Sequence, residues 1–97
     1  MIKKKSAGGP VAGGSYQELS KYVPSTLRPQ HWTELRIDVR RSEPDAETID
    51  LYEGGALLIT ATDSPTITGS PSFGAGRFGI RADKTRFAIK DLSINRL

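Results

Sequence analysis

Residues Trp32–Arg41 read WTELRIDVRR, and this stretch decides the fold class. Leu35, Ile37 and Val39 recur at every second position, and mostly charged residues lie between them. A period of two is typical of a β-strand with one buried and one solvated face, and β-branched residues favour strands. The stretch therefore predicts a half-buried β-strand.

Further strands follow this one along the chain. A short loop rich in acids and containing Pro44 is typical of a hairpin, and two adjacent glycines tolerate the positive φ of a tight turn. The predicted elements, in chain order, are a loop at Ser42–Glu47, a strand at Thr48–Tyr52, a turn at Glu53–Gly55, a strand at Ala56–Thr62, a long loop at Asp63–Gly76, a strand at Arg77–Arg81 and a last stretch at Thr85–Arg96.

The last stretch changes phase. Phe87 and Ile89 share one parity, whereas Leu92 and Ile94 have the other. A β-bulge at Lys90–Asp91 would return both pairs to one face. The sequence thus predicts an all-β fold, an antiparallel meander of about five strands.

The first fifteen residues differ from the rest in composition. Ser6–Ser15 reads SAGGPVAGGS, which buries too little apolar surface to offset the entropy of ordering it. We therefore expect residues 1–15 to form a flexible, basic, glycine-rich tail and residues 16–97 to form the β-domain.

The composition excludes several classes of function. The chain has 97 residues and no cysteine, so disulfides, thiol catalysis and cysteine-bound metals are excluded. Its net charge of +3 equals the contribution of Lys3–Lys5 alone, and no nucleic-acid-binding motif is present. We therefore expect no nucleic-acid partner. No apolar run has the length of a membrane span, and no apolar core of a signal peptide follows the basic start.

Three segments of the chain carry a resemblance to a known family: HWTELRIDVRR, TIDLYEGGALL and GRFGIRADKTRFAIKDLSINRL. Together they resemble the last strands of a concanavalin A-like jelly roll, and they are most similar to the 3-keto-disaccharide hydrolase family. The similar features are Trp32 at the opening of a strand, a glycine-bearing turn at Glu53–Gly55, the GRFGI strand at Gly76–Ile80 and a final apolar strand at Phe87–Ile94. The resemblance covers about Tyr16–Leu97.

This resemblance implies an antiparallel β-sandwich of jelly-roll type, and an extracellular or periplasmic location. A complete jelly roll has more strands than this chain, so the chain corresponds to its C-terminal part. The sheet that would cover the inner face is then largely missing. Because a small sheet with an uncovered face is marginal by itself, we expect a homo-oligomer, a second chain that completes the sandwich, or low stability.

The candidate carbohydrate-binding residues lie on the polar faces of the predicted strands. Arginine side chains pair with acidic groups, and carboxylates and hydroxyls bond sugar hydroxyls. The resemblance places sugars on the concave face of the sheet. The candidates are Arg36, Asp38, Tyr52, Arg81 and Trp32, with Arg40, Asp50, Arg77 and Arg86 on the same side if the strands pair as a meander. The alternative is a solvated face with cross-strand ion pairs, and for Trp32 an edge residue that closes the core.

Catalytic and metal sites are weaker candidates. Glu43, Asp45 and Glu47 have the spacing of the carboxylates in retaining glycosidases, but a proline interrupts them and a solvated hairpin loop is favoured. His31 has no second histidine or cysteine beside it, so we expect a surface residue before the strand. Asp63 is an isolated carboxylate, and we predict neither a metal nor a cofactor.

The function predicted from the sequence is a carbohydrate-associated module that resembles 3-keto-disaccharide hydrolase domains. An oligo- or polysaccharide is the expected partner, and binding is favoured over turnover because no complete set of catalytic groups is evident. The alternative is a non-catalytic structural or protein-interaction β-sandwich module, in which the same sheet packs on another chain.

Overall fold

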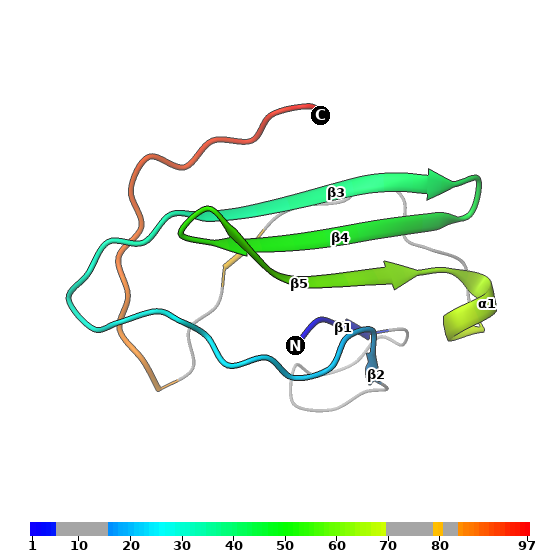
Figure 1. Cartoon of the computed structure of the whole chain (residues 1–97), viewed down its shortest axis with the longest axis horizontal. Helices are drawn as coiled ribbons and strands as arrows, with labels where there is room; N and C mark the ends of the chain where they lie inside the picture. The colour runs from blue at the N-terminus through cyan, green and yellow to red at the C-terminus, as the bar shows by residue number, and fades with distance from the viewer. Residues whose placement is uncertain (6–15, 70–78, 81–83) are drawn as a thin grey trace.

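Antiparallel β-strands in two sheets make up most of the regular structure (Figure 1). The computed structural model describes residues 1–5, 16–69, 79–80 and 84–97. Within them the elements are β1 (Lys3–Lys5), β2 (Tyr16–Glu18), β3 (Leu35–Glu43), β4 (Ala46–Glu53), β5 (Ala56–Asp63) and the one-turn helix α1 (Pro65–Thr68). β1 pairs with β2, and the larger sheet has the order β3-β4-β5. The predicted all-β antiparallel fold class is confirmed.

The larger sheet is the meander expected from the alternating segments. β3 begins at Leu35, so Trp32 precedes the strand instead of opening it. Pro44 and the next residue turn the chain into β4, within the predicted loop. Gly54 and Gly55 connect β4 to β5 with φ of 59° and 83°. Positive φ at both central residues is the type I′ geometry, whose twist matches that of the flanking strands.

The register of the sheet gathers seven aliphatic side chains on one side, called here the apolar face, while Leu57 lies opposite Tyr52 on the other side. In β3 and β4, Ile37 lies opposite Leu51 and Val39 opposite Ile49. In β4 and β5, Leu51 also lies opposite Ile59. The apolar face consists of Leu35, Ile37, Val39, Ile49, Leu51, Ile59 and Ala61. Alternation therefore predicted the sidedness of β3 and β4 correctly.

Burial of the apolar face is uneven. Ile59 and Ala61 of β5 are buried, at 6% and 5% exposure. Leu35, Ile37 and Val39 of β3 are 53–54% exposed, although they lie on the same face. The described residues thus bury the β5 side of the sheet and leave the β3 side open, so the expected common interior is formed only in part.

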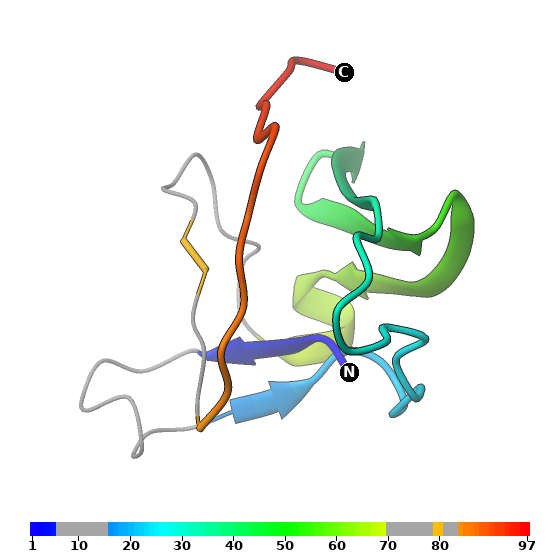
Figure 2. The same cartoon turned by 90° about the vertical axis from the view of Figure 1, so that its left-hand side faces the viewer.

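The N-terminal residues correct one expectation. Lys3–Lys5, predicted to belong to a flexible tail, form β1 and pair with β2 beside β5 (Figures 1 and 2). Residues 16–18 form β2. The tail prediction failed for Lys3–Lys5 because a distant carboxylate pairs with Lys4, a contact that local composition does not report. Residues 6–15 lie outside the described residues.

The C-terminal residues correct the expectation of a last strand at Thr85–Arg96. No strand forms within residues 84–97, where the sequence predicts the fifth strand, and Figure 2 shows this segment separate from the sheet. Asp91 has a φ of 55°, a left-handed conformation that interrupts an extended chain at the site of the predicted bulge. Register shifts occur instead at Arg41/Glu43 and Leu51/Tyr52. The predicted strand at Arg77–Arg81 lies mostly outside the described residues.

The long loop after β5 begins with helix α1. The Ser64 hydroxyl accepts a hydrogen bond from the Ile67 amide, and Gly69 ends the turn with a φ of 73°. Serine at the N-cap and glycine at the C-terminal end satisfy the amide and carbonyl groups that a short helix leaves open. Residues 70–76 of the predicted loop lie outside the described part of the chain.

Candidate functional site

The polar side of the sheet, opposite the apolar face, brings together most of the predicted site residues. Arg36 of β3 lies opposite Tyr52 of β4, and Asp38 lies opposite Asp50. Arg40 lies one pair further along the same side. We call these five residues the polar face. Their shared side was predicted from the alternation, and the register bears it out.

Ion pairs and ring contacts organise the polar face. The Arg36 Nε lies 3.3 Å from Asp38 Oδ1, and the guanidinium carbon lies 3.9 Å from the centre of the Tyr52 ring. Arg40 donates to Asp50 Oδ2, and Thr60 Oγ1 donates to Asp50 Oδ1 at 2.6 Å. Both carboxylates are thus engaged within the sheet, and one face of the Tyr52 ring is covered by Arg36.

The two arginines remain open to solvent. The Arg36 and Arg40 side chains are 56% and 54% exposed, whereas the Asp50 side chain is 9% exposed. A guanidinium carries five N–H donors in a planar fork. The polar face therefore presents cationic hydrogen-bond donors above buried or paired carboxylates, an arrangement suited to an anionic or hydroxyl-rich ligand.

Trp32 lies elsewhere. The residue is 62% exposed, and the Lys90 ammonium lies 4.4 Å from the centre of its ring. It borders a groove of about 910 Å³ between the segment before β3 and the C-terminal residues. Polar residues on this groove include Arg28, His31 and Arg86. The predicted site is therefore divided: Arg36, Asp38 and Tyr52 share the polar face, Trp32 does not, and Arg81 lies outside the described residues.

One further expectation for the polar face is corrected by the same structure. Arg86 was expected on the fifth strand beside Arg36, but it lies in a segment without strand structure and borders the groove. Arg77, like Arg81, is not among the described residues. Arg86 does not share the polar face because the strand expected at Thr85–Arg96 does not form. A residue has a defined side of a sheet only where its strand is paired with another.

The acidic string lies at the β3–β4 hairpin end. Glu43 and Asp45 are exposed and flank the Pro44 turn, and Glu47 is half-buried in β4. A shallow pocket of about 270 Å³ separates this turn from the start of α1. His31 is exposed, as expected. Among the described residues, no group of three or more His, Asp or Glu could hold a metal ion.

Glu53, which the sequence did not single out, is buried at the end of β4 and holds the preceding segment. Ser25 Oγ donates to Oε1 at 2.9 Å, while Thr26 donates to Oε2 from its amide at 2.7 Å and from its hydroxyl at 2.6 Å. The Thr26 hydroxyl bond is the largest cause of a lowered pKa at Glu53, and burial opposes it. Its position beside two glycines suggested a turn and not a buried acceptor.

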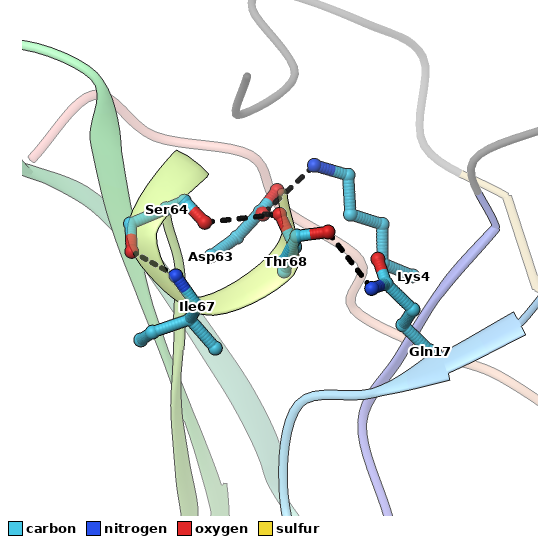
Figure 3. A network of polar contacts seen from close by, with 6 residues as sticks. All are labelled: Lys4, Gln17, Asp63, Ser64, Ile67 and Thr68. Atoms are coloured by element: carbon cyan, nitrogen blue, oxygen red, sulfur yellow. Dashed lines mark hydrogen bonds and ion pairs between the residues drawn. The ribbon is translucent and has the colours of Figure 1, made fainter. Parts of the chain in front are cut away.

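A second set of contacts ties β1 to β5 and β2 to α1 (Figure 3). The Lys4 ammonium lies 2.8 Å from Asp63 Oδ1, and both side chains are nearly inaccessible. Thr68 accepts a bond from Gln17 Nε2 at its carbonyl, 2.8 Å away. Asp63 is therefore engaged by Lys4 in a buried ion pair between β1 and β5.

No protein family, no curated protein and no solved structure matches this chain.

Proposed function

We propose that this chain is a protein-interaction β-module whose apolar face packs against the β-sheet of a second copy of the chain. The observation that carries the proposal is the exposure of Leu35, Ile37 and Val39, each more than half accessible on a regular strand. Aliphatic residues at alternate positions are the pattern of a buried sheet face. The described residues cover less than half of each of these three residues.

The energetic argument is one of apolar area. Burying an aliphatic side chain completely contributes about 1.5–3 kcal/mol relative to full exposure. With about half of each side chain already covered, a partner would contribute roughly 1 kcal/mol at each of the three positions. Sheets pack face to face at about 10 Å, which places such side chains in contact with those of the opposing sheet.

The face also has the alternating sequence of a strand that packs on one side. Its apolar residues alternate with charged ones, so only one side of β3 is apolar. None of the helices among the described residues is long and apolar enough to cross a membrane. The alternation favours a protein sheet as the ligand of the apolar face.

Replacing Leu35, Ile37 and Val39 together by Thr tests this proposal. Thr keeps the β-branched preference for strands but offers less apolar area, so we expect the association of the chain to weaken at least tenfold. Sedimentation velocity over a range of concentrations measures it, and circular dichroism reports retained strand content.

The control replaces Thr48 of β4 and Thr62 of β5, which lie on the other side of the sheet, by Val. Association should be unchanged in this variant. A wild-type chain that stays monomeric at every concentration, with a melting temperature independent of concentration, would contradict the proposal.

Carbohydrate binding at the polar face is the second candidate function. Its supporting observation is the exposed pair of guanidinium groups at Arg36 and Arg40, on one side of one strand. Bidentate pairing to carboxylate or sulfate groups makes acidic polysaccharides the preferred class. The resemblance to the 3-keto-disaccharide hydrolase family, and the extracellular or periplasmic location that it implies, are part of this second proposal.

We expect Arg36→Ala with Arg40→Ala to reduce retention on an immobilised acidic polysaccharide about tenfold or more, because two cationic donors are lost. Arg41→Ala is the matched control, since this residue follows directly but points to the opposite side of the sheet. Affinity chromatography at fixed ionic strength gives the readout. Equal loss in the control and the test variant would indicate nonspecific charge attraction instead.

A further inference from the structure

The outer edge of β3 is the most regular unpaired edge of the larger sheet. β3 is terminal in the order β3-β4-β5 and pairs only with β4 among the described residues. Its run from Leu35 to Arg41 contains no register shift, no proline, no glycine and no lysine. Proteins usually protect a long exposed edge with such devices, since it otherwise pairs with another chain.

One hydrogen bond fixes which backbone groups this edge presents. The Gly54 amide donates to the Glu34 carbonyl at 2.9 Å, so Glu34 faces the β4 side. In an antiparallel ladder, the amide and carbonyl of a residue point to the same side, and the sides alternate along the strand. The backbone amide and carbonyl groups of Leu35, Ile37 and Val39 therefore point away from β4, toward the open edge of the sheet.

We infer that β3 pairs with β3 of a second copy of this chain, antiparallel about a twofold axis at Ile37, to form a continuous six-stranded sheet. A twofold axis makes the contact self-complementary and closed. Ile37 of each copy donates to and accepts from Ile37 of the other, because both groups point outward. This edge contact adds to the proposed interaction function but depends on the edge of β3 and not on the apolar face.

Charge complementarity selects this register. In an antiparallel pairing of two copies, the residue numbers of each opposed pair add up to one constant value. The two side chains of an opposed pair lie on the same side of the sheet. The pairs about Ile37 are Arg36 with Asp38 of the second copy, Glu34 with Arg40, and Leu35 with Val39, each occurring twice. Every charged pair has opposite signs, and every apolar pair extends the apolar face across the junction.

The neighbouring registers lack this match. An axis at Asp38 places this carboxylate opposite its own copy and places Arg36 opposite Arg40. An axis at Arg36 again sets like charges against each other. An axis at Val39 places Ile37 opposite Arg41, so an aliphatic residue meets a charge. Opposite-charge pairs directly across a ladder stabilise it and like-charge pairs destabilise it, so the axis at Ile37 is favoured.

Charge reversal tests the register with the full-length chain. Arg36→Asp and Asp38→Arg each create two like-charge contacts in the dimer, and we expect each variant alone to dimerise at least tenfold more weakly than wild type. Mixed in equal amounts, the two variants should form a heterodimer, since the new carboxylate of one faces the new guanidinium of the other. Sedimentation velocity and native mass spectrometry measure both results.

Matched controls change the charge equally away from the pairing. Lys21→Asp lies in the exposed segment between β2 and β3, and Asp45→Arg lies in the β3–β4 turn. Both should dimerise as wild type does. If the single variants dimerise normally, or if the mixture forms no heterodimer, the register is wrong.

Amide exchange separates this inference from the proposed packing of the apolar face. Edge pairing protects the outward amides of Leu35, Ile37 and Val39, and this protection should rise with protein concentration. Packing on the apolar face covers side chains and leaves these amides exchanging. Protection that does not change with concentration would show that the edge is covered within one chain. Absence of protection in an associated sample would show that the copies pack only through the apolar face. Either result would overturn the inference.

Discussion

Replacing Asp63 by Ala is expected to lower the free energy of unfolding by about 3–5 kcal/mol, because it removes one member of a buried ion pair. The Lys4 ammonium and the Asp63 carboxylate lie 2.8 Å apart, with side chains only 2% and 6% exposed. A charge that loses its opposite charge in such a place is poorly solvated. Small domains are stable by only about 5–15 kcal/mol, so urea denaturation should detect a large shift in midpoint.

Two further variants make the Asp63 result interpretable. Lys4→Met combined with Asp63→Leu removes both charges and should restore most of the lost stability, since an apolar pair of similar volume is often as stable as a buried ion pair. Asp45→Ala changes an exposed carboxylate in the β3–β4 turn and should have little effect. A loss below about 1 kcal/mol in Asp63→Ala would show that solvent reaches the Lys4 site.

Glu53→Gln should cost about 2 kcal/mol and should flatten the dependence of stability on acid pH. Three donors from Ser25 and Thr26 converge on the Glu53 carboxylate. Glutamine keeps one oxygen and replaces the other with a donor, which leaves at least one of these bonds unmade. Amide exchange at residues 25 and 26 should accelerate in the variant.

The sign of the pH effect follows from the lowered pKa of Glu53 in the folded chain. An unfolded chain binds the proton at higher pH than the folded chain does, so the contribution of Glu53 is fully present above the ordinary value of 4.5. It is lost as the pH falls from there through the lowered pKa. Wild-type stability should decline over this range, and Glu53→Gln should lack that component.

Glu43→Gln is the control for Glu53. Glu43 is exposed at the end of β3, so its replacement should leave the acid part of the stability curve close to that of wild type. Denaturation midpoints between pH 3 and pH 7 compare the three proteins. A Glu53→Gln curve parallel to that of wild type throughout this range would refute the assignment.

Local alternation predicted the sheet but not its limits. The period of two in Leu35–Val39 defines which side chains share a face, and the two glycines at 54 and 55 define a tight turn, because both properties depend on neighbouring residues alone. The same reasoning failed at Thr85–Arg96. A strand exists only where another strand accepts its hydrogen bonds, and alternation does not show whether one is present.

The sequence predicted the positions of some candidate site residues correctly and of others incorrectly. Arg36, Asp38 and Tyr52 meet on the polar face because strands of known parity pair in register. Trp32 and Arg86 were placed on that face by assuming strands that are absent at those positions. Parity is therefore a sound guide inside a hairpin, where turn length fixes the register, and a poor one where the pairing itself is unknown.

The sequence by itself determined the antiparallel β character, the two hairpins and the division of β3 and β4 into an apolar and a polar face. These depend on side-chain period and on turn residues, which act over a few positions. Only the tertiary structure decided that Lys4 meets Asp63 across 59 positions and that Glu53 binds Thr26. It also decided that the described residues leave the β3 side of the apolar face open. Burial and long-range pairing depend on which segments meet in space, and no local pattern of residues encodes that.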